Sequence, residues 1–327
     1  MQYRELGKSG IQLSVIGISC CGFDVASGGW ALTEKEATQI IHAGMDFGIN
    51  YFDSAIVSKM DDSGSVLGKA VKGRRDETII AATGIVESFD PNEIIRGCEN
   101  TLTNLQTDYI DFYKLSLPNR QVPLSRVWRV LETLMESGKV RALGVHHFAM
   151  NEISEAIKFG NVVANQVSYN LLWRGIEYEV RDRCAENGLS IIGDHPLANG
   201  LLSGKYASVH DYPEERMNNR LFSSSHSHTQ HGENGAEDEV FMTLEMIRSI
   251  AQEMDLPMSD LSLAWLLSQS TVTSVLTGAR SSEQVYQNAQ ASDLLLDQTI
   301  IDSLNDVSAF LKEEMGTNID LYACAGE

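Results

Sequence analysis

The chain has 327 residues, of which 43% are hydrophobic, and this length suits one α/β barrel with insertions. Its 25 Lys and Arg residues stand against 45 Asp and Glu residues, and the formal net charge of −20 repels nucleic-acid phosphates and anionic membranes. The N-terminus has no signal-peptide pattern, and no run reaches the roughly 20 apolar residues that span a bilayer. We therefore expect a cytoplasmic protein that binds a small-molecule substrate and contacts neither nucleic acid nor membrane.

Short apolar runs of strand length alternate along the chain with longer segments of helical period. This alternation is typical of βα units around a parallel sheet, and eight such runs predict a (β/α)8 TIM barrel in one domain over residues 1–327. The predicted strands are Val15–Ile18, Asn50–Asp53, Thr78–Thr83, Tyr109–Leu115, Val140–Val145, Val162–Val167, Ser190–Gly193 and Ser274–Thr277.

Turn and capping residues predict the segments between the strands. Before the first strand, Tyr3–Gln12 contains two glycines in a hairpin-like arrangement that could close the lower end of the barrel. Thr33 and Glu36 have the spacing of a capping box, which predicts a helix from Thr33 to Phe47 that ends at Gly48. Proline at the start predicts two more helices, over Pro91–Leu105 and Pro123–Ser137.

One long segment, Tyr206–Asp238, interrupts the alternation between the seventh strand and a helix predicted over Val240–Met254. It is rich in Ser, His, Asn and Gly, which predicts a long loop after strand 7 at the mouth of the barrel. The spacing of His226, His228 and His231 would allow a metal site. The polar composition favours a solvated loop instead.

Eight stretches, in order and over nearly the whole chain, resemble landmarks of the aldo-keto reductase superfamily, closest to its L-galactose dehydrogenase and D-threo-aldose dehydrogenase types. The resemblance implies a TIM barrel that binds NAD(P) and carries a catalytic Asp, Tyr, Lys and His at its mouth. In that mechanism the Tyr hydroxyl, tuned by the Lys, protonates a carbonyl. The stretches begin YRELGKSG at Tyr3, GINYFDSA at Gly48, LGKAV at Leu67, LQTDYIDFYKL at Leu105, SGKVRALGV at Ser137, NQVSYNLL at Asn165, HPLANGLLSGKY at His195 and TGARSSEQVYQN at Thr277.

Matched position by position, the resemblance leaves only one of the four catalytic residues in place. Asp53 stands at the position of the Asp. Ser58 replaces the Tyr, Gly84 replaces the Lys and Ser116 replaces the His. A serine hydroxyl is far too weak an acid to substitute for the tyrosine, so the resemblance implies a largely lost tetrad.

The positions that the resemblance assigns to the cofactor divide into two groups. At the nicotinamide end, His146 and His147 replace a Ser-Asn pair, Asp194 replaces a stacking Tyr, and His195 replaces a Ser. The other positions are kept, so NADP is a possible cofactor, with Arg280 as the partner of its 2′-phosphate. The kept positions are Asn165, Gln166, Gly278, Arg280, Gln284 and Asn288.

The replacements place new polar groups at the ends of the fifth and seventh strands, where barrel residues are typically catalytic. With Asp53, the residues His146, His147, Asp194 and His195 could perform acid/base catalysis without a metal. A divalent metal on His146, Asp194 and His195 is also possible, as is simple filling of vacated space. Since neighbouring strand residues point in opposite directions, we expect that His146 and His147 do not both face the mouth, nor Asp194 and His195.

Three functions follow from these observations. The first is non-redox acid/base chemistry of lyase, isomerase or hydrolase type on a carbonyl or sugar-like small molecule. The second is a diverged NAD(P)-dependent oxidoreductase that uses His146 or His147 as its proton donor. The third is a non-catalytic sensor or subunit that retains an NADP site.

Overall fold

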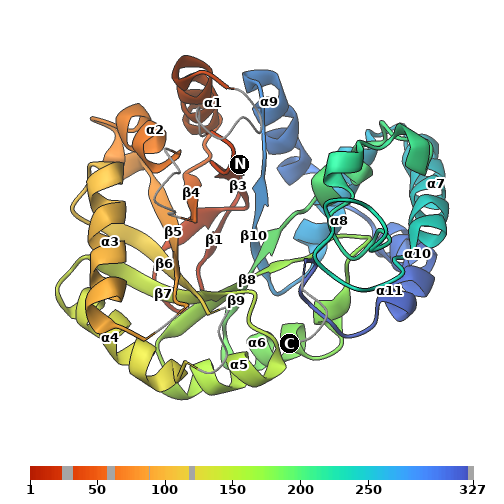
Figure 1. Cartoon of the computed structure of the whole chain (residues 1–327). Helices are drawn as coiled ribbons and strands as arrows, with labels where there is room; N and C mark the ends of the chain where they lie inside the picture. Colours follow the sequence, from red (N-terminus) through yellow and green to blue (C-terminus); the bar gives the residue numbers. More distant parts are fainter. Residues whose placement is uncertain (24–31, 57–62, 88, 118–121, 323–327) are drawn as a thin grey trace.

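The computed structural model describes residues 1–23, 32–56, 63–87, 89–117 and 122–322 (Figure 1). Eight parallel strands close into a barrel in the order β10-β3-β4-β5-β6-β7-β8-β9, so the TIM barrel expected from the sequence is confirmed. Every predicted strand overlaps an observed one. The barrel strands are β3 (Ile16–Ser19), β4 (Tyr51–Ile56), β5 (Ile79–Ile85), β6 (Ile110–Ser116), β7 (Val140–His146), β8 (Val162–Ser168), β9 (Ser190–Asp194) and β10 (Val272–Thr277).

Helices surround the barrel on its outside (Figure 1). Among the described residues, none of the helices combines the length and the apolar character needed to cross a membrane. The helices are α1 (Glu34–Asp46), α2 (Ser63–Ala70), α3 (Pro91–Leu105), α4 (Leu124–Glu136), α5 (Met150–Ala156), α6 (Val180–Asn187), α7 (Glu237–Glu253), α8 (Met258–Ser268), α9 (Ser282–Gln290), α10 (Gln298–Val307) and α11 (Ala309–Met315).

An antiparallel hairpin of β1 (Tyr3–Glu5) and β2 (Gln12–Ser14) precedes the barrel. Leu6 and Leu13 of this hairpin are fully buried and pack with Phe112 in the barrel interior. The hairpin therefore closes the lower end of the barrel, as predicted, and leaves its opposite end for a site.

The predicted capping box at the start of α1 is confirmed. The Thr33 backbone N–H donates to the Glu36 carboxylate at 2.8 Å, and the Glu36 backbone N–H donates to Thr33 Oγ1 at 3.3 Å. These bonds satisfy two backbone donors that a helix start otherwise leaves unpaired. Gly48 ends the segment with a φ of +82°, which glycine adopts without strain.

The segment 206–238 is a long connection without strands, as predicted, but it is not solvated throughout. Tyr212 and Phe222 are buried, and their rings stack with centroids 5.2 Å apart. Arg220 holds both oxygens of Glu233, at 2.7 and 2.6 Å. The buried aromatic rings and this bidentate ion pair fix the segment locally. The polar composition of the segment did not indicate this packing.

Candidate active site

A layer of polar side chains crosses the barrel at the C-terminal ends of its strands. Lys114 Nζ on β6 donates to Asp53 Oδ2 on β4 and to Gln166 Oε1 on β8, each at 2.5 Å. Gln166 Nε2 in turn donates to Asp194 Oδ2 on β9 at 3.1 Å. A continuous hydrogen-bonded network therefore joins four strands across the mouth.

Lys114 is the principal residue of this network that was not predicted from the sequence. Its side chain is fully buried, which is rare for lysine unless the charge is paired. The signal was present in the sequence: Lys114 lies two residues after Phe112 in the same strand, so both face the barrel interior. Asp53 therefore has a lysine partner, which comes from β6.

Gly84 is the position matched to the family lysine, and a side chain there would point away from the barrel interior. A Cβ atom built on Gly84 would lie 2.2 Å from Tyr113 Oη, and Tyr113 packs in the hydrophobic layer outside the strands. A side chain at position 84 would thus face away from Asp53. Ser116, matched to the family histidine, ends β6 and is partly exposed, while Ser58, matched to the tyrosine, lies outside the described residues.

His146 and His147 both face Asp194, and the expectation that only one of them faces the mouth was wrong. Their Nε2 atoms lie 3.8 and 3.9 Å from Asp194 Oδ2, with ring centroids 4.3 Å apart. The reason is local backbone geometry: β7 ends at His146, and His147 has a φ of +56°. A left-handed residue breaks the strand alternation on which the expectation rested.

The same backbone conformation occurs at the end of β9. The expectation that Asp194 and His195 do not both face the mouth was also wrong. His195 has a φ of +51°, and its Nδ1 lies 3.6 Å from Asp194 Oδ2. Its backbone N–H donates to Asp194 Oδ1 at 2.9 Å. Of six non-glycine residues with positive φ in the described chain, four follow β7 and β9: His147, His195, Ala198 and Asn199. Such strain concentrates at functional sites.

Burial and neighbouring charges shift the ionisation of this cluster. Burial alone would raise the pKa of Asp194, but His195, His146 and His147 outweigh it and hold the pKa well below its usual range. Burial, then His147, lowers the pKa of His146 to about 4 despite Asp194. Near neutral pH, Asp194 is therefore an anion and His146 a neutral imidazole.

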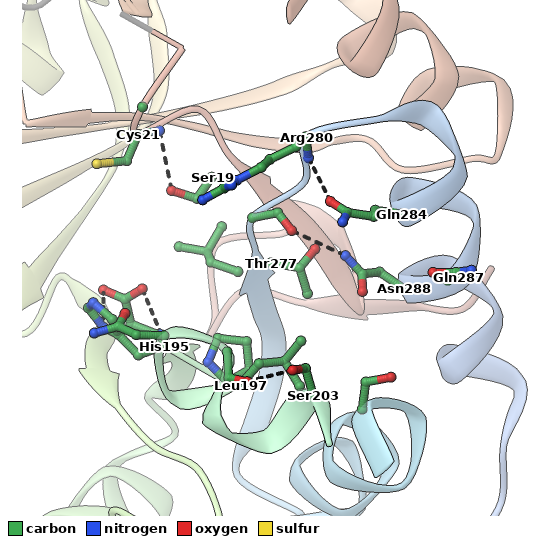
Figure 2. Close-up of a pocket in the computed structure, with 18 of the residues that line it drawn as sticks. Ser19, Cys21, His195, Leu197, Ser203, Thr277, Arg280, Gln284, Gln287 and Asn288 are labelled. Carbon is green, nitrogen blue, oxygen red and sulfur yellow. Dashed lines mark hydrogen bonds and ion pairs between the residues drawn. The ribbon is translucent and has the colours of Figure 1, made fainter. Parts of the chain in front are cut away.

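A cavity of about 750 Å³ extends from Asp194 and His195 towards the start of α9. Figure 2 shows His195 on one side of it and Arg280, Gln284 and Asn288 on the other. This volume lies in the range of small-molecule and cofactor sites. The cavity joins the polar layer of the barrel to the segment that the sequence predicts to bind a nucleotide.

The charged residues of the cavity are mostly cationic. Lys205, Arg216 and Arg280 line it against one carboxylate, Asp194, although acidic residues exceed basic ones in the whole chain. A site with this inverted charge balance favours an anionic ligand.

The predicted nucleotide residues lie together on the segment from β10 to α9. The Arg280 backbone N–H donates to Gln284 Oε1 at 2.8 Å, and Asn288 Nδ2 donates to the Gly278 carbonyl at 3.4 Å (Figure 2). All four line the cavity. The two hydrogen bonds fix the shape of this loop and of the helix start that follows it.

The two remaining cofactor predictions, Asn165 and Gln166, separate in the structure. Asn165 is fully buried, and its amide bonds the Phe148 backbone at 2.8 and 3.3 Å. Asn165 therefore anchors the loop after β7, and its contact with a cofactor stays a prediction. Gln166 points to the mouth, but its amide oxygen and nitrogen bind Lys114 and Asp194.

Comparisons with known proteins agree with this architecture. The sequence profile of the Aldo/keto reductase family matches residues 21–309. The uncharacterized oxidoreductase YrpG of Bacillus subtilis is 29% identical over 94% of this chain and 96% of its own length. A probable voltage-gated potassium channel subunit beta of Oryza sativa is 26% identical, with 94% and 96% coverage. The solved aldo-keto reductase AKR11C1 of Bacillus halodurans, in its holo form, superposes with a TM-score of 0.75 at 26% identity, covering 94% and 96%.

Proposed function

Since the chain belongs to the aldo/keto reductase family, we propose that it is an NAD(P)-dependent oxidoreductase that acts on a small carbonyl or sugar-like compound, as one domain over residues 1–327. The observation that carries this proposal is the cavity with three cations and one carboxylate in a chain of net charge −20. The phosphates of a dinucleotide supply the negative charge that such a lining requires. The charged residues that line the cavity thus fit NAD(P), the cofactor that family members typically bind.

The segment from β10 to α9 would hold the nucleotide. Arg280 would bind a 2′-phosphate, which favours NADP over NAD, and Gln284 and Asn288 would contact the adenosine side. Bound NAD(P) would supply or accept the hydride. Gln166 would meet the nicotinamide end only after releasing Lys114 or Asp194, because both groups of its amide are engaged.

We propose that the acid/base end of the site is rebuilt. Lys114, on β6, would be the ammonium partner of Asp53. In the family this partner is a lysine on the strand that corresponds to β5. The tyrosine acid has no equivalent in the matched residue Ser58. His146, His147 and Asp194, with His195 beside them, would therefore govern the proton at the substrate oxygen.

Cofactor titration and turnover measurements test this proposal. We expect NADPH to bind more tightly than NADH, detected by nicotinamide fluorescence. We also expect oxidation of NADPH, followed by its absorbance, with at least one member of a panel of aldehydes and sugars. Absence of binding by both cofactors would overturn the proposal, and tight NADP binding without any turnover would indicate the sensor or subunit.

A second candidate is non-redox acid/base catalysis, and one observation favours it specifically. Asp194 occupies the position of a ring-stacking tyrosine, and Gln166 is tied to it, so the nicotinamide half of the site is not preformed. The His146 and Asp194 pair could instead move a proton beside a substrate carbonyl. Nuclear magnetic resonance would detect deuterium uptake from D₂O into carbonyl or sugar substrates when no nicotinamide cofactor is added. Absence of any uptake would exclude this candidate.

A further inference from the structure

Three side chains at the barrel mouth converge on one point. We infer that His146, His147 and Asp194 form a binding site for a divalent transition-metal ion. The two imidazoles and the carboxylate each offer one atom, and these three atoms all lie within 4.8 Å of one another. The group differs from the set expected from sequence, because His147 takes the place of His195.

The donor spacing is close to that of a loaded site. The two Nε2 atoms lie 3.8 and 3.9 Å from Asp194 Oδ2. Bonds of about 2.0–2.2 Å in a tetrahedral site place ligand atoms roughly 3.4 Å apart. Binding would therefore require a contraction of about 0.5 Å in these two pairs and of at most about 1.4 Å between the two imidazole nitrogens, which lie within 4.8 Å of each other. Imidazole rotation can supply this contraction.

The carboxylate is already oriented by its own hydrogen bonds. Gln166 Nε2 donates to Oδ2 at 3.1 Å and the His195 backbone N–H donates to Oδ1 at 2.9 Å. Such outer contacts fix the direction of a metal-binding carboxylate. The Gln166 amide is itself held by Lys114, so the support extends to the far side of the barrel.

The charge balance of the mouth also favours a cation. Lys114 pairs with Asp53, and Asp194 has no ion pair to Lys or Arg among the residues that the structure describes. Asp194 is only 18% exposed in its side chain. A carboxylate that is largely buried and has no Lys or Arg partner favours a compensating positive charge.

The ligand chemistry selects the class of ion. Two imidazole nitrogens with one carboxylate oxygen suit Zn²⁺, Fe²⁺ or Co²⁺, whereas Ca²⁺ and Mg²⁺ prefer oxygen ligands. Three protein ligands leave at least one coordination position for water or a substrate oxygen.

The site lies where its ion could act. Asp194 lines the cavity, so an ion on its Oδ2 would polarise a carbonyl oxygen in the place where the family uses a tyrosine acid. This catalytic role rests on the proposed oxidoreductase function. Metal binding itself does not, and it is measured without nicotinamide.

Isothermal titration of the full, metal-free chain with Zn²⁺ and with Co²⁺ tests the site. We expect one ion per chain, and we expect Asp194→Asn and His147→Asn each to weaken binding at least about 100-fold, the upper end of losses seen for outer-shell changes. Asparagine at 147 tolerates the left-handed backbone of that residue. His226→Gln is the matched control, because His226 also pairs with a carboxylate, Glu237 at 3.0 Å, and it should bind the ion like the wild type.

Failure of the wild type to bind one equivalent, or wild-type affinity in both ligand variants, would overturn the inference. If the variants do not fold, crystals soaked in Zn²⁺ decide. An anomalous peak between His146, His147 and Asp194 would support the site, and its absence there would refute it. A parallel NADPH titration without metal reports on the proposed function alone, so the two failures are distinguishable.

Discussion

The two ends of the cavity are built in contrasting ways. At the end proposed to hold the nucleotide, called the nucleotide end below, Arg280 and Gln284 lie four residues apart and Gly278 and Asn288 lie ten apart, so one loop and one helix start define this end. At the barrel mouth, Lys114 contacts partners 61 and 52 residues away, Asp53 and Gln166. The first end depends on local sequence, and the second exists only once the barrel has closed.

This contrast teaches why the two ends can diverge separately. At the nucleotide end, the exposed residue Arg280 lines the cavity. The mouth holds buried charges that depend on one another, so a change at one position requires a change at a neighbour. Substitutions at the mouth should therefore change the stability of the fold, whereas substitutions at the nucleotide end should change the affinity for the cofactor.

The largest expected effect is that of Lys114→Met. Removing the ammonium leaves Asp53, 3% exposed, as a buried carboxylate without its lysine. We expect the free energy of unfolding to fall by about 3–5 kcal/mol, measured by urea denaturation. Unchanged stability would show that the ion pair between Lys114 and Asp53 does not stabilise the fold.

A double variant isolates the charge from the packing. Asp53→Leu combined with Lys114→Met replaces the ion pair with apolar groups of similar size. We expect it to recover about 2 kcal/mol relative to Lys114→Met alone, since removing both members of the ion pair leaves no buried carboxylate at position 53. No recovery would assign the loss to packing or to Gln166.

The second effect separates chemistry from cofactor binding. Asp194→Asn keeps the shape of the side chain but removes the charge that faces His146 and His147. We expect turnover with NADPH to fall at least about 100-fold, as for loss of a group in acid/base catalysis. NADPH affinity should change less than about tenfold, or 1.4 kcal/mol. Equal losses in both quantities would show that the two ends are not independent.

The contrast also explains what the sequence could predict. Strand alternation and glycine stops are local signals, and they predicted all eight strands, the capping box of Thr33 and Glu36, and the hairpin. The nucleotide segment from Gly278 to Asn288 is local as well, and its residues indeed line the cavity.

The mouth could not be predicted in the same way, because its geometry depends on backbone angles and on distant partners. The spacing of residues does not predict that His147 and His195 adopt positive φ, yet this conformation turns both side chains towards Asp194. Lys114 could have been suspected from its position two residues after Phe112, on the inward face of the strand. Its pairing with Asp53 required knowing which strands lie across the barrel from each other.

A smaller effect is expected at the nucleotide end. Arg280→Gln removes the guanidinium proposed to bind a 2′-phosphate, a charge-assisted contact of about 1.5–3 kcal/mol. We expect NADPH affinity to fall about 10–100-fold, while NADH affinity and stability stay close to wild type. Arg96→Gln on α3 is the control, because Arg96 is 64% exposed and lies outside the cavity lining. Equal weakening of NADH would contradict the role in 2′-phosphate recognition.

The smallest effect comes from a site that belongs to neither end. Glu177 accepts bonds from Arg174 and Lys312, which tie the 3₁₀ turn after β8 to α11. Burial would raise the pKa of Glu177, but Arg174 and Lys312 outweigh it and lower the pKa below 4.5. Glu177→Gln should therefore cost about 1.5 kcal/mol of stability at pH 7, with cofactor affinity unchanged.

The pH dependence of that loss identifies its cause. A carboxyl whose pKa is lower in the folded than in the unfolded chain contributes stability above the unfolded pKa, and the contribution disappears as pH falls through the folded pKa. The difference between wild type and Glu177→Gln should accordingly be full at neutral pH and shrink as pH falls below 4.5, measured by urea denaturation across that range. A difference that persists in acid would assign the loss to packing around Glu177 and not to its charge. Turnover that falls together with stability at neutral pH would show that the scaffold, and not only the mouth, limits the chemistry.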